Sequence, residues 1–193
     1  MGMSTVCYLR QFEESQVDAL LEEPRKVLIY LFGKVEEPPK HFYDKMLGKQ
    51  SPVREDIDAL FHEPLIEIDI SMAWHGIHYL LTGSDWEGEK PLCYLVRGGI
   101  DIGDIDVGYG TARVLKKENV RNFAEALADV EIERLKERYD PKAMADLDIY
   151  PGIWNGDAVI GDPLEYLLKN FEKLRAFVKV ASEEGKCILI YLC

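Results

Sequence analysis

Hydrophobic residues recur at helical spacing along much of the chain, in segments separated by proline, glycine and short extended runs. The clearest segment is 162–185, where a stripe of leucine and phenylalanine follows Asp162 and Pro163 and stops at Gly185. Aspartate suits an N-cap, proline suits the first turn, and Glu165 at the third helical position completes a capping-box arrangement. The pattern predicts a long amphipathic helix that covers one side of the core.

Further helices are expected from the same spacing and from end signals. The apolar segment 24–33 is too short for periodicity to distinguish a helix from a buried strand, so both remain open. Asp140 and Pro141 supply the cap and first turn of a short helix. The other expected helices are 12–24, 118–140 with a break near Val130, 140–147, and a short helix around HFYDKML inside the proline-rich, linker-like segment 35–53.

Runs of β-branched and aromatic residues predict strands between these helices. The run 66–70 alternates like a strand, although an extended approach to the next helix has the same pattern. Residues 91–99 predict a buried strand closed by two glycines, and the acidic, glycine-punctuated segment 98–115 predicts a loop or hairpin. The strands nearest the two ends are expected at 3–10 and 187–193.

Strands near both ends and in the middle therefore alternate with helices. No internal repeat or low-complexity tract interrupts this order. The pattern predicts one mixed α/β (α+β) domain over residues 1–193, with a central sheet that includes the N- and C-terminal strands and is packed by several helices.

The segment 69–83, DISMAWHGIHYLLTG, places two histidines in an apolar stretch that has a helix end signal on each side. Ser71 suits an N-cap and Gly83 suits the residue after the last turn, so a helix is expected over 72–82. On a helical wheel, tryptophan, isoleucine and leucine share one face. The opposite face, covered by water or by a second structural layer, carries His75, His78, Tyr79 and Thr82.

Three roles fit the histidine pair. It could be a structural pair with backbone or carboxylate partners, a ligand site in which one imidazole is a hydrogen-bonding group or general base, or part of a metal site. Zinc needs further ligands, and HxxH lacks the glutamate and the spacing of HExxH. We therefore predict no metal and no cofactor.

Loop aromatics and one arginine extend this candidate site. Aromatic side chains in loops often line pockets, and an arginine in an acidic chain is a possible partner for an anion. No GxGxxG, GxxxxGK[ST] or GxSxG motif indicates a phosphate cradle or a nucleophile. The candidate ligand-binding residues are His75, His78, Tyr79, Thr82, Tyr109, Arg113, Tyr150 and Trp154.

The net charge of the chain limits the kinds of partner that can be expected. The 193 residues include 35 acidic and 23 basic side chains, which gives a formal charge of −12. Such a field repels nucleic acid and anionic membranes, so a basic protein or a small molecule is the better expectation.

Apolar runs are too short to span a bilayer, and the four cysteines form no CxxC pair. We expect a cytoplasmic protein with buried free thiols, of which Cys193 is the most exposed.

Several segments together resemble the YfbM-like family of small bacterial proteins. They are the MGM start, DISMAWHGIHYLLTG, GYGTARVL, DIYPGIW and the ending EYLLKNFEKLRAFVKVASEEGKCILIYLC, in this order along essentially the whole chain. The resemblance implies a compact single-domain α/β fold and a bacterial cytoplasmic origin. It implies no activity and supplies no catalytic residues.

Two functions follow as hypotheses. The first is a soluble acidic binding or interaction protein, because acidic surfaces speed encounter with basic partners and no catalytic signature is present. The alternative is a small-molecule-binding protein or enzyme that uses a polar site at His75 and His78. A concave pocket beside this pair that contains Trp154, Tyr109 or an arginine would favour the alternative.

Overall fold

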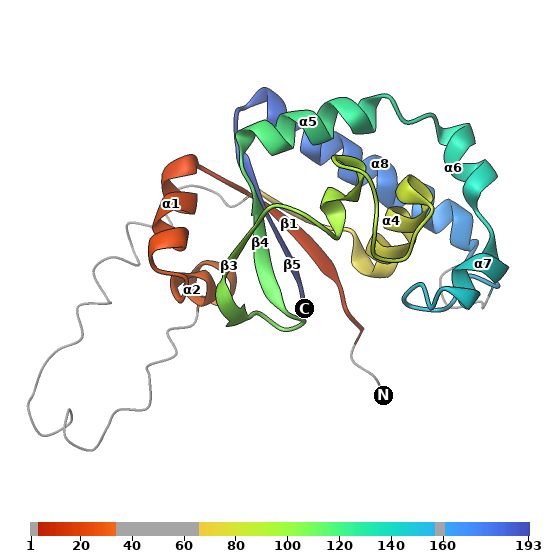
Figure 1. The fold of residues 1–193 in the computed structure, drawn as a ribbon, viewed down its shortest axis with the longest axis horizontal. Coiled ribbons are helices and arrows are strands. Elements are labelled where there is room, and N and C mark those ends of the chain that lie inside the picture. Colours follow the sequence, from red (N-terminus) through yellow and green to blue (C-terminus); the bar gives the residue numbers. More distant parts are fainter. Residues whose placement is uncertain (1–3, 34–65, 157–160) are drawn as a thin grey trace, which may run out of the picture.

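A five-stranded antiparallel sheet organises the protein (Figure 1). The computed structural model describes residues 4–33, 66–156 and 161–193. The strand order is β2-β1-β5-β4-β3, so the last strand in sequence lies between β1 and β4. The strands are β1 (Cys7–Phe12), β2 (Glu67–Asp69), β3 (Ile100–Asp106), β4 (Thr111–Leu115) and β5 (Cys187–Leu192).

Two short helices, α1 (Glu14–Glu22) and α2 (Lys26–Phe32), cover one face of the sheet. Val17 and Leu20 of α1 and Tyr30 of α2 are buried there against alternate residues of the sheet. Alternation explains this arrangement, because successive strand residues point to opposite faces. The segment 24–33 is thus a helix, which settles the choice that periodicity left open.

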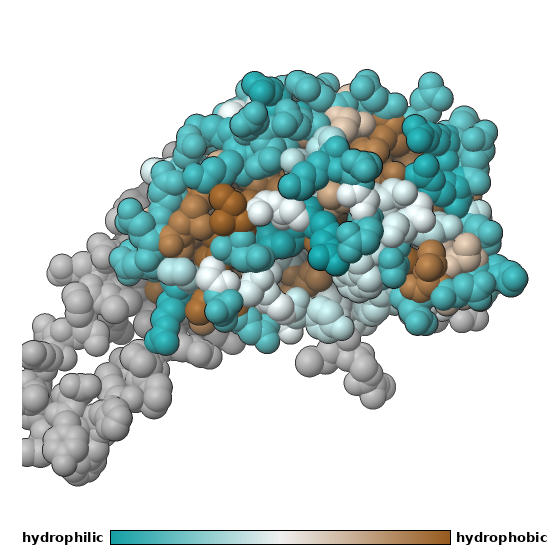
Figure 2. Space-filling view, in the orientation of Figure 1, coloured by the Kyte–Doolittle hydropathy of each residue, from teal (hydrophilic) through white to brown (hydrophobic). Residues whose placement is uncertain are grey.

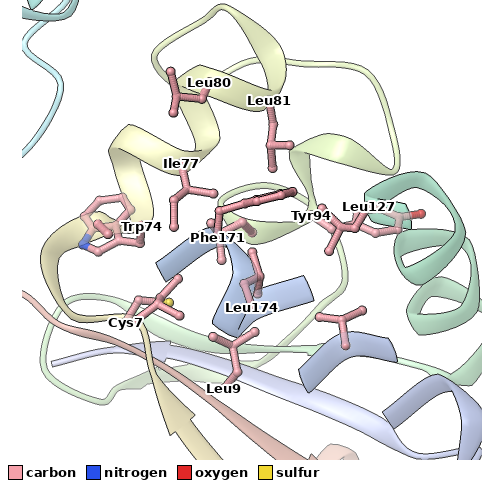
Figure 3. Close-up of a cluster of buried hydrophobic side chains, with 14 of the residues drawn as sticks. Cys7, Leu9, Trp74, Ile77, Leu80, Leu81, Tyr94, Leu127, Phe171 and Leu174 are labelled. Atoms are coloured by element: carbon pink, nitrogen blue, oxygen red, sulfur yellow. The ribbon is translucent and has the colours of Figure 1, made fainter. Parts of the chain in front are cut away.

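The larger core lies on the opposite face. Figure 3 shows Ile77 and Leu80 above Phe171 and Leu174, with Leu9 of β1 below them. Each of these buried side chains contributes roughly 1.5–3 kcal/mol. The helices on this side are α4 (Trp74–Thr82), α5 (Lys117–Ala128), α6 (Ile132–Arg138), α7 (Pro141–Asp146) and α8 (Pro163–Glu183).

Most expected elements are confirmed, with ends that differ by a few residues. The expected hairpin is β3–β4, the break near Val130 separates α5 from α6, and the 66–70 run contains β2. Asp140 and Asp162 each accept backbone N–H bonds as N-caps. The expected helix around HFYDKML and its linker-like surroundings, 35–53, lie outside the described residues.

The strand expected over 91–99 is wrong. Residues Leu92–Leu95 form a short 3-10 helix instead, and none of them joins the sheet. Three carbonyl oxygens of this segment accept hydrogen bonds from Arg113 on β4. The Arg113 side chain therefore satisfies carbonyl groups that, in a strand, would have bonded to the backbone of a neighbouring strand.

The cap expected at Ser71 is also wrong. Ser71 has a φ of 52° and opens a single 3-10 turn, Ser71–Ala73, and α4 starts after that turn. The other end agrees with the expectation, because Gly83 is left-handed with a φ of 77° and its N–H donates to the Tyr79 carbonyl oxygen. A left-handed glycine commonly closes a helix in this way. At α8, Asp162 caps the helix without a reciprocal bond from Glu165.

Candidate functional site

His75 is buried, and both of its ring nitrogens are engaged. Nδ1 accepts the backbone N–H of Tyr150 at 3.0 Å, and Nε2 lies 2.8 Å from the carbonyl oxygen of Asp85. A nitrogen that accepts carries no proton, so the other must donate, and the ring is the neutral Nε2–H tautomer. Burial also lowers the pKa of His75. The imidazole therefore joins two loops and offers no free nitrogen to a substrate.

Aromatic rings surround this imidazole. The Trp74 indole is stacked on it with centroids 5.0 Å apart and an interplanar angle of 10°, and the Trp86 ring lies 4.5 Å away on the loop after α4. Tyr150 is stacked on Trp74 at 5.6 Å. The Trp74 Nε1–H donates to the Thr5 carbonyl oxygen. Because His75 holds the Asp85 carbonyl and contacts the next side chain, it fixes where Trp86 lies.

His78 is fully buried one turn further along α4. Its Nε2 lies 3.5 Å from the Thr82 hydroxyl, and its Nδ1 has no hydrogen-bond partner within the described ranges. Burial, followed by repulsion from His75 at 6.5 Å between centroids, lowers the pKa of His78 to about 4. The face of α4 that carries the histidines is thus covered by loops and not by water. Of the two alternatives left open by the sequence, the second structural layer is the one observed.

Tyr79 and Trp154 lie elsewhere in the core. Trp154 is buried, its Nε1–H donates to the Ile149 carbonyl oxygen at 2.7 Å, and its ring packs against Gly76 so closely that an added Cβ would lie 2.9 Å from it. Tyr79 is buried in the larger hydrophobic core, where burial, followed by the negative charge of Asp140, raises the pKa of its phenol. Both side chains fill space between α4 and its neighbours.

A pocket of about 190 Å³ opens at the end of the sheet, beside the rings that contact His75. Its floor is the face of β4 and β5 that carries Thr111, Arg113, Ile190 and Leu192. Indole and phenol rings form the walls, which is the lining expected of a small-molecule site. The remaining lining residues are Trp74, Trp86, Leu95, Val96, Tyr109 and Tyr191.

Arg113 is held at the floor of this pocket by backbone carbonyls. Its Nη1 donates to the Gly98 oxygen at 2.7 Å and, at 3.5 Å, to Tyr94, and its Nη2 donates to Leu95 at 2.9 Å. In the described part of the chain it forms no ion pair with a carboxylate. Burial lowers the pKa of the guanidinium. A partly desolvated cation therefore lies in an aromatic pocket. The dipoles of the three carbonyl groups offset part of the hydration that it loses.

Two exposed aromatic side chains flank the pocket. Trp86 is 42% exposed and Tyr109 is 64% exposed. Tyr109 lies in the β3–β4 turn, where its N–H donates to the Leu192 carbonyl oxygen and the Asp106 carboxylate accepts two further N–H groups. Large apolar rings held exposed on ordered backbone are typical of recognition surfaces.

A larger hollow of about 440 Å³ lies between α6 and the start of α8. It is a broad, open depression lined by Ile132, Leu164 and Leu168 with acidic residues around them, and none of its described lining residues is a buried polar side chain. Figure 2 shows hydrophilic residues over most of one face of the molecule, with hydrophobic residues in separate patches. We regard the smaller, more enclosed pocket as the candidate site, because it combines aromatic walls with the half-buried charge of Arg113.

The structure brings some of the sequence-predicted site residues together. Tyr109 and Arg113 line the pocket, whereas His75 and Tyr150 support the rings behind it and His78 and Thr82 lie one turn away. Sequence reasoning missed Trp86. It lies in a loop three residues after the glycine that ends α4, and the loop argument applied to Tyr109 would have selected it as well.

Metal binding finds no support in the described residues, which contain no group of three or more His, Cys, Asp or Glu side chains that could hold an ion. All four cysteines are free thiols, three buried and Cys193 exposed, as expected. Burial raises the pKa of Cys7 to about 12. Across residues 4–33, 66–156 and 161–193, no helix has the length and apolar character needed to cross a bilayer.

Fold and site define the class: a three-layer α+β protein with an antiparallel sheet and a small aromatic pocket at the end of that sheet. A family model described as "Domain of unknown function (DUF1877)" matches residues 3–191, so the chain belongs to this family. The chain is similar to the crystal structure of a protein of unknown function, YfbM from Escherichia coli, with a TM-score of 0.65 and 18% identity over 97% of this chain and 99% of that chain. The resemblance found from sequence is thereby confirmed at the level of fold. A search of curated proteins finds no match.

Proposed function

We propose that this chain is a binding protein that takes a small organic ligand into the pocket flanked by Trp86 and Tyr109. The observation that carries the proposal is that a buried histidine, bonded on both ring nitrogens, fixes the loop of an exposed tryptophan at the pocket. A surface indole held in this way keeps a flat apolar wall available without the entropy cost of ordering it on binding.

Binding without catalysis is the better-supported reading of the histidines. A general base needs a free nitrogen within hydrogen-bond reach of its substrate. His75 uses both nitrogens within the protein, and neither histidine lines the pocket. The alternative inferred from sequence is therefore kept in a modified form, in which the imidazoles support the site and the aromatic rings contact the ligand.

A fragment screen by NMR tests the proposal. Tryptophan indole N–H signals are followed during titration with small aromatic and amphipathic compounds, and we expect the Trp86 signal to shift. Trp86→Ala and Tyr109→Ala should each weaken binding about tenfold or more, as expected for aromatic anchors. Val180→Ala is the control, because Val180 is an equally exposed side chain on α8 outside the pocket. Fragments that bind the two pocket variants as tightly as the wild type would refute the proposal.

Interaction with a basic protein is the second candidate. The net charge of −12 favours it, and exposed Asp101, Asp104 and Asp106 lie on the strand beside the pocket. Acidic patches around aromatic anchors raise association rates with basic partners. The test is co-purification from a bacterial lysate at low salt, compared with a variant in which these three aspartates are asparagine. Equal recovery with both chains, or recovery of no basic protein, would argue against it.

We place the protein in the bacterial cytoplasm as part of this proposal. Its support is the state of the cysteines, which are four free thiols. A reducing compartment maintains thiols in this form.

A further inference from the structure

We infer that the ligand of this pocket carries a carboxylate, which binds Arg113, attached to a planar apolar group that lies between Trp86 and Tyr109. The inference rests on the proposed function, because it names the chemistry of the ligand for the same site. It is argued from the hydrogen-bond capacity of Arg113, from its unpaired charge and from the size of the pocket.

Arg113 has unused hydrogen-bonding capacity. A guanidinium group carries five N–H donors in a fixed planar fork. Three bonds go to carbonyl oxygens, two from Nη1 and one from Nη2. Among the described residues, Nε–H and one Nη2–H thus remain without an acceptor, and Arg113 lines the pocket. Carboxylates, like phosphates, bind guanidinium donors strongly, often in pairs of parallel bonds.

The charge of Arg113 is also unpaired within the described residues, although an aspartate lies opposite it in the sheet. Asp101 and Arg113 are partners in the β3–β4 ladder, where opposite charges commonly pair. The Asp101 carboxylate instead accepts the Thr111 hydroxyl at 3.0 Å, and Arg113 donates three hydrogen bonds to the 94–98 backbone. Asp101 still acts on the guanidinium electrostatically. It therefore competes with any anion that enters the pocket.

The pocket limits the rest of the ligand. Its volume of about 190 Å³ is below the range of about 300–1,000 Å³ that is typical for drug-sized ligands, so a single ring with a short acidic substituent suits it better than a nucleotide. Trp86 and Tyr109 both line the pocket and are both exposed, and stacking on aromatic rings favours a planar group. The acidic surface elsewhere matters less, because charges separated by more than about 8 Å are largely screened at physiological salt.

Benzoate and benzamide provide a matched pair of probes, equal in shape and different in charge. Both are titrated into the full chain and followed through the Trp86 indole signal. We expect benzoate to bind at least about tenfold more tightly than benzamide, because the hydrogen bonds of an ionised acceptor are about twice as strong. Asp101→Asn should tighten benzoate binding severalfold and leave benzamide unchanged, since it removes the competing charge.

Asp104→Asn is the control variant. It makes the same change in net charge at another exposed position of β3, which, unlike Asp101, is neither the ladder partner of Arg113 nor among the groups that act on its guanidinium. The expected result is benzoate affinity close to that of the wild type. Equal tightening by Asp101→Asn and Asp104→Asn would show a general charge effect and would overturn the role of Arg113.

The two proposals fail in different ways. If benzamide binds as tightly as benzoate and both shift the Trp86 signal, the carboxylate inference is wrong and the pocket remains a binding site. If neither probe, nor any other fragment, shifts the Trp86 signal, the proposed function itself is wrong. Circular dichroism of each variant shows whether the fold is retained, and Asp101 and Asp104 are exposed enough for both substitutions to be tolerated.

Discussion

The imidazole of His75 lies 4.5 Å from the indole of Trp86, with an angle of 38° between the two rings. One ring is 1% exposed and the other 42% exposed, so the contact joins the core to the surface. The histidine also bonds the backbone of the loop that carries the tryptophan. The geometry of the pocket therefore depends on a residue that does not line it.

Replacing His75 by leucine should lower the free energy of unfolding by about 2–4 kcal/mol. The substitution leaves the Tyr150 N–H and the Asp85 carbonyl oxygen without partners, and an orphaned buried group costs about 1–3 kcal/mol. His78→Leu is the matched control and should change stability by about 1 kcal/mol or less at pH 7, because its ring makes one long contact with Thr82 and one backbone contact with Glu87, and its Nδ1 has no bond to lose. Urea denaturation measures both. Equal losses in the two variants would contradict this account of His75.

Stability should fall below neutral pH. The pKa of His78 is about 4 in the folded protein, against an ordinary value of 6.5 for histidine in the unfolded chain, so above pH 6.5 both states are neutral and nothing is lost. As the pH falls from 6.5 towards 4, only the unfolded state gains the proton, and folding weakens. For His78 the loss between pH 7 and pH 5 is about 2 kcal/mol. His78→Leu should therefore show a shallower decline in urea denaturation than the wild type, and an identical decline would refute the assignment.

Gly76→Ala should destabilise the protein although alanine is the better helix former. The added Cβ would lie 2.6 Å from Leu167 Cδ2 and 2.9 Å from the Trp154 ring. Overpacking of this kind costs about 1–3 kcal/mol, which exceeds the gain of about 1 kcal/mol in helix propensity. Leu167→Val removes one of the clashing atoms, so the double variant should recover part of the loss. Thermal unfolding of the four proteins measures this coupling, and strict additivity would show that the clash is absent.

Two arginines of the same region, Arg113 and Arg97, should differ sharply in their contribution to the free energy of unfolding. Arg113→Met leaves the carbonyls of the 94–98 segment without their donor and should cost about 3 kcal/mol. Arg97→Met removes an exposed ion pair with Glu87 and a bond to the Trp86 carbonyl oxygen, and should cost about 1 kcal/mol or less. Guanidinium chloride denaturation compares them. Similar losses would mean that the 92–95 turn does not depend on Arg113.

The elements that sequence predicted well are those with local causes. Asp162 and Pro163 begin α8, Asp140 begins α7, and Gly83 ends α4, because each cap bonds backbone a few residues away. Local signals of this kind stand in the sequence itself.

The elements that sequence did not predict depend on distant partners. Nothing within 91–99 indicates that Arg113, 15–19 residues away, donates to three of its carbonyl oxygens. The helical wheel correctly placed the histidines apart from the leucine stripe, but it could not show which loop covers them. The pocket likewise needs Trp86, Tyr109 and Leu192, which come from a loop, a turn and a strand that meet only in the folded protein.

The position of β5 has a consequence for how the protein is made. The middle of the sheet is filled by residues 187–192, which the ribosome adds after every other described element. Until those residues emerge, β1 and β4 have no common neighbour, and the apolar sides of α8 and α2 have an incomplete sheet to pack on. The sheet of the nascent chain can therefore be completed only after residues 187–192 have emerged from the ribosome, and earlier intermediates expose strand edges to other chains.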